Sequence, residues 1–379
     1  MQPLAILLET QNIIAVSTIC ILTLLIISFK FQIKRYLLYS LIIISIIFLT
    51  NYFLFNVKEI TLVIFIEFLA KSFSLMVIGS YPINTKYLVR YFYIFSLVNF
   101  ISLSLILFFG LIDSISYMRF GYAMLPTVLF SCYAFSKSEK YRKAIWLIVC
   151  VSSFLMTLVY GSRGPMLGLL IFVLIILFFD PKIHFIKKAV YAITLTLGVS
   201  YLLVFNGLIR FLDYIYYDLN ISTYSIIKLK IMLEEGLLES SSGRDNLYEN
   251  FFEQIIVSPI FGNGIGITQK LWGVTPHNMF LQIMIEFGII GLAVCTFLAG
   301  FLVYALFKIR KVDNVLFFLL SIIFAVSFGR LLVSSDLWLR PELWLFISLS
   351  INNFKTITIK RHKKNRVENK LNTIRVKET

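Results

Sequence analysis

The stretch MFLQIMIEFGIIGLAVCTFLAGFLVYALF, Met279–Phe307, decides the fold class of this chain. A helix needs about 20 apolar residues to cross the hydrocarbon core of a bilayer, and this run is longer than that. The rest of the chain has the same character, since 59% of its 379 residues are hydrophobic and 15% are charged. Soluble domains carry roughly a quarter charged residues, so the composition predicts an integral membrane protein.

Similar apolar runs recur along the chain between short polar breaks. They predict an all-α polytopic membrane protein with about 11 transmembrane helices (10–12) and one large extracytoplasmic loop. The first run is not followed by a small-residue cleavage site, which favours a retained span over a removed signal peptide. The expected spans are 11–29, 37–55, 60–80, 91–112, 119–136, 144–160, 166–179, 187–206, 279–307, 314–334 and 341–354.

Positive charge is concentrated in alternate loops, as the positive-inside rule requires of cytoplasmic segments. The formal net charge is +15, but this distribution indicates membrane topology and contact with anionic lipid, and it argues against nucleic acid as a partner. We therefore expect the N-terminus outside and the C-terminus in the cytoplasm. The basic groups assigned to the cytoplasm lie at 30–35, 86–90, 137–143, 182–188, 308–311 and 355–377.

One long polar break separates two sets of spans. Within it, SSGRDNLYENFFEQIIVSP predicts an amphipathic helix, because apolar residues recur every fourth position from Leu247 and Pro259 ends the run. Such a helix lies at the membrane surface or packs over the bundle. STYSIIKLKIMLEEGLLES is a second candidate helix. The expected parts are transmembrane helices in 1–206, the extracytoplasmic loop in 207–276, C-terminal transmembrane helices in 277–354 and a basic cytoplasmic tail in 355–379.

Two arginines on the expected outer side are candidate functional residues. Arg163 lies in the tight break YGSRGPMLG between two spans, where a cation at the membrane surface needs an anionic partner or snorkels to the headgroups. Arg244 would occupy the first turn of the amphipathic helix, where the helix dipole disfavours a cation. Beside free backbone N–H groups it could help to bind a phosphate, or it could pair with Asp245 or Glu249.

His277 stands where a polar segment meets an apolar helix, in GVTPHNMFLQ. Thr275 suits the N-cap and Pro276 the first helical position, which predicts His277 and Asn278 in the first turn. The unsatisfied N–H groups there keep the imidazole neutral, so it can accept a proton from a hydroxyl or donate a hydrogen bond to an oxyanion. Asn278 would add an amide for binding. The alternative is an interfacial histidine with a structural hydrogen bond.

Other polar positions have weaker patterns. Arg210, Arg330 and Arg340 are further outer-side cations that could contact a lipid phosphate. The glycines of FGNGIG, 262–266, favour a loop reversal over an anion-binding nest or a dinucleotide site. Glu67 and Lys71, four residues apart inside a span, predict an intramembrane ion pair, and a proton or ion pathway is the alternative.

The sequence contains none of the common metal-binding or nucleotide-hydrolysing motifs. It has no His-Glu-x-x-His, no Asp-x-Asp pair, no cysteine pair at ligand spacing and no P-loop. Its four cysteines lie inside apolar runs, where we expect packed thiols and no disulfide framework. We therefore expect no metal and no cofactor.

Three motifs in order, GSRGPMLG, SGRDNLYENFFEQIIVSPIFGNGIG and HNMFLQIMIEFGIIGL, resemble the bacterial O-antigen polymerase and O-antigen ligase superfamily over about 146–307. The resemblance implies a GT-C-type glycosyltransferase of the bacterial inner membrane that uses undecaprenyl-diphosphate-linked oligosaccharide without a metal. Arg163 and Arg244 would bind the diphosphate, and His277 would act as acceptor base or diphosphate contact. A flippase and a chain-length regulator are the implied protein partners.

Polymerase and ligase share the donor and differ in the acceptor. We favour the polymerase of the Wzy type, which makes O-antigen or capsule, because the outer loop is not strongly basic, whereas the phosphate-rich acceptor of a ligase, lipid A core, would call for more cations. A different class, a flippase or exporter of lipid-linked sugar, would need intramembrane charges and no chemistry at His277. The one-sided loop and the lack of visible sequence repeats count against that alternative.

Overall fold

A computed structural model describes residues 34–81, 83–109, 117–161, 163–179, 186–187, 207–218, 223–234 and 245–356. Within these ranges the chain is helical and contains no β-strand, which confirms the all-α prediction. Among the described residues, six helices are long and apolar enough to cross a membrane: Arg35–Leu54, Lys58–Gly79, Thr85–Phe108, Lys140–Tyr160, Met279–Arg310 and Asn314–Leu331. The protein is therefore a multi-pass membrane protein.

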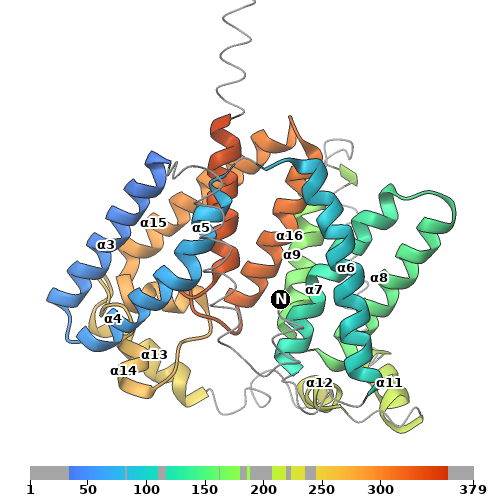
Figure 1. Cartoon of the computed structure of the whole chain (residues 1–379). Helices are drawn as coiled ribbons and strands as arrows, with labels where there is room; N and C mark the ends of the chain where they lie inside the picture. The colour runs from blue at the N-terminus through green and yellow to red at the C-terminus, as the bar shows by residue number, and fades with distance from the viewer. Residues whose placement is uncertain are drawn as a thin grey trace, which may run out of the picture.

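The helices follow the expected spans wherever those spans fall on described residues (Figure 1). The expected spans 11–29 and 187–206 lie outside the described residues, apart from Lys187, so the count of eleven stays a prediction. The elements are α3 Arg35–Leu54, α4 Lys58–Glu67, the π-helix η1 Phe68–Phe73, α5 Ser74–Gly79, α6 Thr85–Phe108, α7 Tyr117–Lys137, α8 Lys140–Tyr160, α9 Arg163–Phe179, α11 Gly207–Asp213, the π-helix η3 Tyr214–Asp218, α12 Tyr224–Glu234, α13 Asp245–Val257, α14 Ile267–Trp272, α15 Met279–Arg310, α16 Asn314–Leu331 and a last helix over 341–356.

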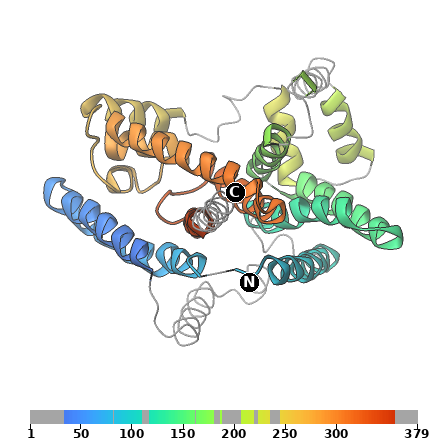
Figure 2. The same cartoon turned by 90° about the horizontal axis from the view of Figure 1, so that it is seen from above.

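The two ends of the bundle differ in structure and charge. The short helices α11, α12, α13 and α14 gather at one end, which we call the α11–α14 end (Figure 1). Seen from above, α13 and α14 lie beside α15, whereas α11 and α12 lie beside α8 (Figure 2). The opposite end, where α3, α6 and α8 begin, carries many of the basic residues assigned above to the cytoplasm: Lys34, Arg35, Lys86, Arg90, Lys137, Lys140, Arg142, Lys143, Lys308, Arg310 and Lys311.

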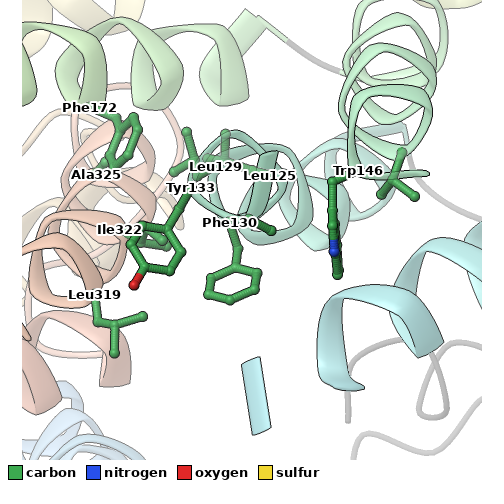
Figure 3. Packing of buried hydrophobic residues seen from close by; sticks show 11 residues of the cluster. Leu125, Leu129, Phe130, Tyr133, Trp146, Phe172, Leu319, Ile322 and Ala325 are labelled. Atoms are coloured by element: carbon green, nitrogen blue, oxygen red, sulfur yellow. The ribbon is translucent and has the colours of Figure 1, made fainter. Parts of the chain in front are cut away.

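Helix α7 is the centre of the larger packing cluster. Its Leu125, Leu129 and Phe130 are buried against α8, α9 and α16 (Figure 3). Glycines bring α9 and α16 close together, since a Cβ atom on Gly329 would lie 2.6 Å from the Gly168 Cα atom. In lipid such contacts matter because helices associate through close van der Waals packing and not through a hydrophobic driving force. The cluster fixes the ends of α7, α9 and α16 relative to one another.

The last helix, over 341–356, stands between α5 and α16 (Figure 1). Its Phe346 and Leu349 are buried with Phe317 of α16. On the other side, the Ser348 hydroxyl donates to the Met76 carbonyl over 2.6 Å. This helix therefore joins α5 to α16.

Helix α15 is interrupted at Gly288, which has φ 62° and ψ −159°. The preceding loop pairs with the break, because Ile289 N donates to Pro259 O over 2.9 Å and Gly264 N donates to Glu286 O over 3.1 Å. The glycine-rich loop is thus a reversal, as expected, and its backbone takes up the polar groups that the break would leave unsatisfied in the membrane. The sequence did not predict the break within the apolar run 279–307.

Several local predictions are confirmed. The two candidate loop helices are α12 and α13, and α13 ends at Val257, just before Ser258 and Pro259. Lys71 Nζ lies 2.6 Å from Glu67 Oε2, in the expected ion pair. The expected parts 1–206, 207–276, 277–354 and 355–379 stay predictions, and most of the tail lies outside the described residues.

Candidate functional site

Three helices, α7, α9 and α16, meet at the α11–α14 end around Arg330 and Tyr122. The Arg330 guanidinium carbon lies 4.8 Å from the centre of the Tyr122 ring, in a cation–π contact between α16 and α7. The Tyr122 hydroxyl accepts a hydrogen bond of 2.9 Å from Ser334. Helix α9 begins at the same place, because a Cβ atom on Gly164 would lie only 1.8 Å from the Tyr122 hydroxyl.

Arg340, in the loop between α16 and the last helix, lies close enough to Arg330 for the two charges to repel. Burial lowers the pKa of Arg340 to about 10, the Glu342 carboxylate raises it, and the Arg330 charge lowers it. At neutral pH Arg340 is still protonated. Its Nε atom donates to Ser335 Oγ, and its Nη1 atom lies 4.0 Å from Glu342 Oε2. Two cations whose charges repel, one of them with a buried Nε atom that has no hydrogen-bond partner among the described residues, form a site suited to an anion.

A buried hydrogen-bond network fixes the loop that carries Arg340. Gln282 Nε2 donates both to Glu286 Oε1, over 3.0 Å, and to Asp336 Oδ2, over 2.9 Å. Gln282 Oε1 accepts from Leu337 N over 2.9 Å, and Trp338 Nε1 donates to Glu286 Oε2 over 3.0 Å. Because buried polar groups are costly when unpaired, this mutual satisfaction specifies one position for the loop against α15.

Asp336 also accepts hydrogen bonds from backbone N–H groups of its own loop. Its Oδ1 atom accepts from Trp338 N over 2.8 Å and from Leu339 N over 3.3 Å, which closes a turn two residues before Arg340. Burial raises the pKa of the Asp336 carboxyl, and the hydrogen bonds from Trp338 N and Leu339 N oppose that rise. The turn therefore depends on a carboxylate that is buried but well supplied with donors.

The prediction for the start of α15 is wrong. Helix α15 begins at Met279, and Asn278 is its N-cap, with Oδ1 accepting from Phe280 N over 2.9 Å and from Leu281 N over 3.3 Å. Asparagine is at least as good an N-cap as threonine, and here it displaces the predicted cap Thr275. His277 and Asn278 thus precede the first turn, and the argument from its free N–H groups no longer applies to the imidazole.

His277 has a left-handed backbone, with φ 53°, which is uncommon for a residue other than glycine. Its Nδ1 atom lies 3.3 Å from the Thr275 hydroxyl. Next to it, the Phe280 and Phe328 rings are 6.4 Å apart, so the start of α15 packs on the end of α16, two residues before Arg330. Unusual backbone conformations gather at functional sites, and this one directly precedes the helix that packs on the end of α16.

The structure brings together some of the predicted residues and not others. The start of α9, with Arg163 as its first residue, adjoins Tyr122, which contacts Arg330. The charge of Arg330 also acts on Arg340. Arg210 is exposed on α11, a helix that packs with α12 beside α8. Arg244 lies outside the described residues.

Sequence reasoning missed Tyr122, Glu342 and the network of Gln282, Glu286 and Asp336. A signal was present for Gln282 and Glu286, which are polar residues four apart in an otherwise apolar run and are therefore expected to face a partner inside the protein. No local signal marks Tyr122, since its contacts with Arg330 and Ser334 join residues more than two hundred positions apart.

These observations define the class: a multi-pass helical membrane protein whose helix ends converge on a cationic cluster at one end of the bundle. Residues 148–296 match the family model described as O-antigen ligase, which confirms the resemblance to the O-antigen polymerase and ligase superfamily over that segment. The matched segment includes Arg163 and His277 and ends within α15. Neither a search of curated proteins nor a search of solved structures returned a match. The family match supports an O-antigen polymerase or ligase type of function, acting on lipid-linked oligosaccharides.

Proposed function

We propose that this protein is a polysaccharide polymerase that joins undecaprenyl-diphosphate-linked oligosaccharide repeat units at the outer face of the bacterial inner membrane. The observations that carry the proposal are the contact of the Arg330 guanidinium with the Tyr122 ring at one end of the bundle and the repulsion between the charges of Arg330 and Arg340. An anion with several charges would relieve that repulsion, and the head group of a polyprenyl diphosphate is such an anion.

The reaction is an inverting glycosyl transfer. The acceptor hydroxyl attacks the anomeric carbon of the donor sugar, the bond from that carbon to the diphosphate oxygen breaks, and the lipid diphosphate leaves with the electron pair. Negative charge grows on the leaving group in the transition state, where positioned arginines stabilise it. We infer that Arg163 and Arg244 contact the diphosphate with Arg330 and Arg340, and that Arg210 lies further from it. Arginines in this role replace a divalent cation, so no metal and no nucleotide is needed.

His277 is proposed to stand at the reacting centre. Its imidazole would accept the proton of the attacking hydroxyl, or donate a hydrogen bond to a diphosphate oxygen. Its contact with the Thr275 hydroxyl, 3.3 Å from Nδ1, would orient the ring. Asn278 uses its side-chain oxygen for the helix cap, which leaves the role of substrate ligand to its amide nitrogen.

The acceptor distinguishes polymerase from ligase. A polymerase takes the terminal sugar of another lipid-linked unit, whereas a ligase takes a sugar of lipid A core, which carries phosphate. The described part of the α11–α14 end outside the arginine cluster has scattered lysines and several carboxylates, including Glu249 and Glu253 on α13. That balance favours the less charged acceptor, and a second lipid-linked substrate would then approach His277 from the acceptor side.

The orientation follows from the charges. The basic end of the bundle would face the cytoplasm, with the N-terminus outside and the C-terminus inside. A flippase that delivers the lipid-linked unit and a regulator of chain length are the proposed partners.

The direct test uses purified protein in detergent with the lipid-linked repeat unit of the native host. The proposal expects lipid-linked products longer by whole repeat units, formed in the presence of EDTA. The competing transport function is tested with His277→Ala: loss of transfer with intact translocation supports the polymerase. Blocked translocation with unchanged transfer would show that the protein is a flippase or exporter.

A further inference from the structure

The cluster around Arg340 contains one hydrogen-bond donor and one acceptor that remain unused within the described structure. The Nε atom of Arg330 and the Oε2 atom of Glu342 are both buried, and neither has a hydrogen-bond partner among the described residues. Arg340 Nη1 lies 4.0 Å from Glu342 Oε2, and the charge of Arg330 also acts on Arg340. Buried polar atoms normally find partners, so these two atoms are candidate contacts for a ligand.

The unused atoms describe the chemistry of that ligand. The N–H of Arg330 needs an acceptor, and an acidic oxygen of a phosphate is the strongest available. The carboxylate of Glu342 can only accept, so it needs an O–H or N–H donor. A bare diphosphate offers acceptors alone, whereas a glycosyl diphosphate offers both groups, because the hydroxyls or amide N–H of its first sugar lie next to the phosphate oxygens.

We propose that Glu342 is a sugar-binding residue, whose carboxylate accepts a hydrogen bond from a hydroxyl or amide N–H of the sugar attached to the diphosphate. This inference rests on the proposed function, since the arginines must hold the diphosphate for Glu342 to reach the sugar. Glu342 then distinguishes the sugar-bearing donor lipid from the lipid diphosphate product. Its carboxylate favours binding of the glycosyl diphosphate and repels the bare diphosphate that leaves.

Two structural roles of Glu342 do not explain why its buried Oε2 atom has no hydrogen-bond partner among the described residues. A carboxylate in the first turn of a helix is favoured by the helix dipole, and Glu342 follows Pro341 at such a position. That effect needs no buried oxygen. A structural ion pair with Arg340 would draw the two groups together, but Nη1 and Oε2 are 4.0 Å apart, at the outer limit for an ion pair and beyond hydrogen-bond distance.

The test compares two lipids on one protein. Wild type, Glu342→Ala and Glu342→Gln are titrated in detergent with undecaprenyl diphosphate and with the undecaprenyl-diphosphate-linked repeat unit extracted from the native host. Binding is followed by the change in tryptophan fluorescence. The matched control is Glu59→Ala, which removes an exposed carboxylate from the start of α4 at the same end of the bundle.

In Glu342→Ala we expect affinity for the sugar-bearing lipid to fall about tenfold, the effect of losing one charged hydrogen bond. Affinity for undecaprenyl diphosphate should stay the same or rise, because a repelling charge is gone; this also shows that the variant is folded. Glu342→Gln keeps an acceptor and should bind the sugar-bearing lipid with intermediate affinity. Glu59→Ala should bind both lipids as wild type does.

Equal weakening for both lipids would mean that Glu342 acts only by holding Arg340, and it would overturn the inference while leaving the proposed function in place. Unchanged binding of both lipids by Glu342→Ala would overturn it as well. If wild-type protein binds neither lipid, the proposed function itself fails, and this inference fails with it.

Discussion

Replacing Gly288 by alanine should destabilise the protein, because the backbone break of α15 at this position requires glycine. With φ 62° and ψ −159°, Gly288 has a conformation that costs other residues about 1–3 kcal/mol. The new Cβ atom would lie 2.3 Å from Ile260 O and 2.7 Å from Pro259 O, both backbone atoms that cannot rotate away. Relief requires loss of the hydrogen bonds from Ile289 N to Pro259 O and from Ile290 N to Ile260 O, at about 0.5–1.5 kcal/mol each.

The combined loss in unfolding free energy is therefore about 2–6 kcal/mol. The matched control is Gly300→Ala in the same helix, where no atom lies within 4 Å of the new Cβ atom. Alanine in a helix interior is favoured by about 1 kcal/mol, so this variant should be as stable as wild type or more so. The assay is heating in detergent, with the folded fraction measured by size-exclusion chromatography. Equal melting temperatures for Gly288→Ala and Gly300→Ala would refute the role of the break.

Four further predictions concern the site and its support. Arg163→Lys should lower transfer at least tenfold at normal protein level, because an ammonium cannot grip a diphosphate in the bidentate way; normal transfer would reduce Arg163 to a structural residue. Gln282→Leu should lower the free energy of unfolding by about 2–5 kcal/mol, since the buried carboxyl groups of Glu286 and Asp336 each lose a hydrogen-bond donor. The control Glu67→Gln, in an exposed ion pair, should lower it by less than about 1 kcal/mol. Tyr122→Phe should bind lipid diphosphate almost as wild type does, and Tyr122→Leu should bind it about threefold to tenfold more weakly, because only leucine removes the ring face under the guanidinium; equal binding by both would exclude the cation–π contact. Transfer should continue in EDTA, and a loss that Mg²⁺ restores would contradict a metal-independent site.

The parts of the fold that the sequence predicted are those governed by local composition. Membrane-crossing helices are marked by length and hydropathy alone, and the break at Gly161 and the end of α13 at Val257 follow from glycine and proline. The Glu67–Lys71 pair was predicted because both residues lie on one face of one helix. Each of these features is decided within a few residues of sequence.

The start and the break of α15 show where local reasoning stops. Thr275 and Asn278 are both capable caps, and the choice of Asn278 depends on where the helix packs on Phe328. The break at Gly288 exists because the segment 259–264 supplies backbone partners for it, and an apolar run gives no sign of that pairing.

The candidate site likewise combines residues that the local sequence points to with contacts that only tertiary packing creates. Arg330 and Arg340 were picked out as further outer-side cations, but the interaction of their charges, and the place of Tyr122 beside Arg330 of α16 and Gly164 of α9, come from tertiary packing. Glu342 looks like an ordinary first-turn carboxylate until its distance from Arg340 is known. Residue type can be read from a sequence, whereas the partners that turn residues into a site cannot.

The central claim is polymerisation of lipid-linked repeat units, and the most direct measurement is the length profile of surface glycan after deletion of the gene in the native host. Lipid-linked intermediates are analysed in parallel. The account predicts that the glycan shrinks to a single repeat unit on its final acceptor and that long polymer is absent from undecaprenyl diphosphate. Long polymer that accumulates on undecaprenyl diphosphate and never reaches the acceptor would contradict the account and identify a ligase.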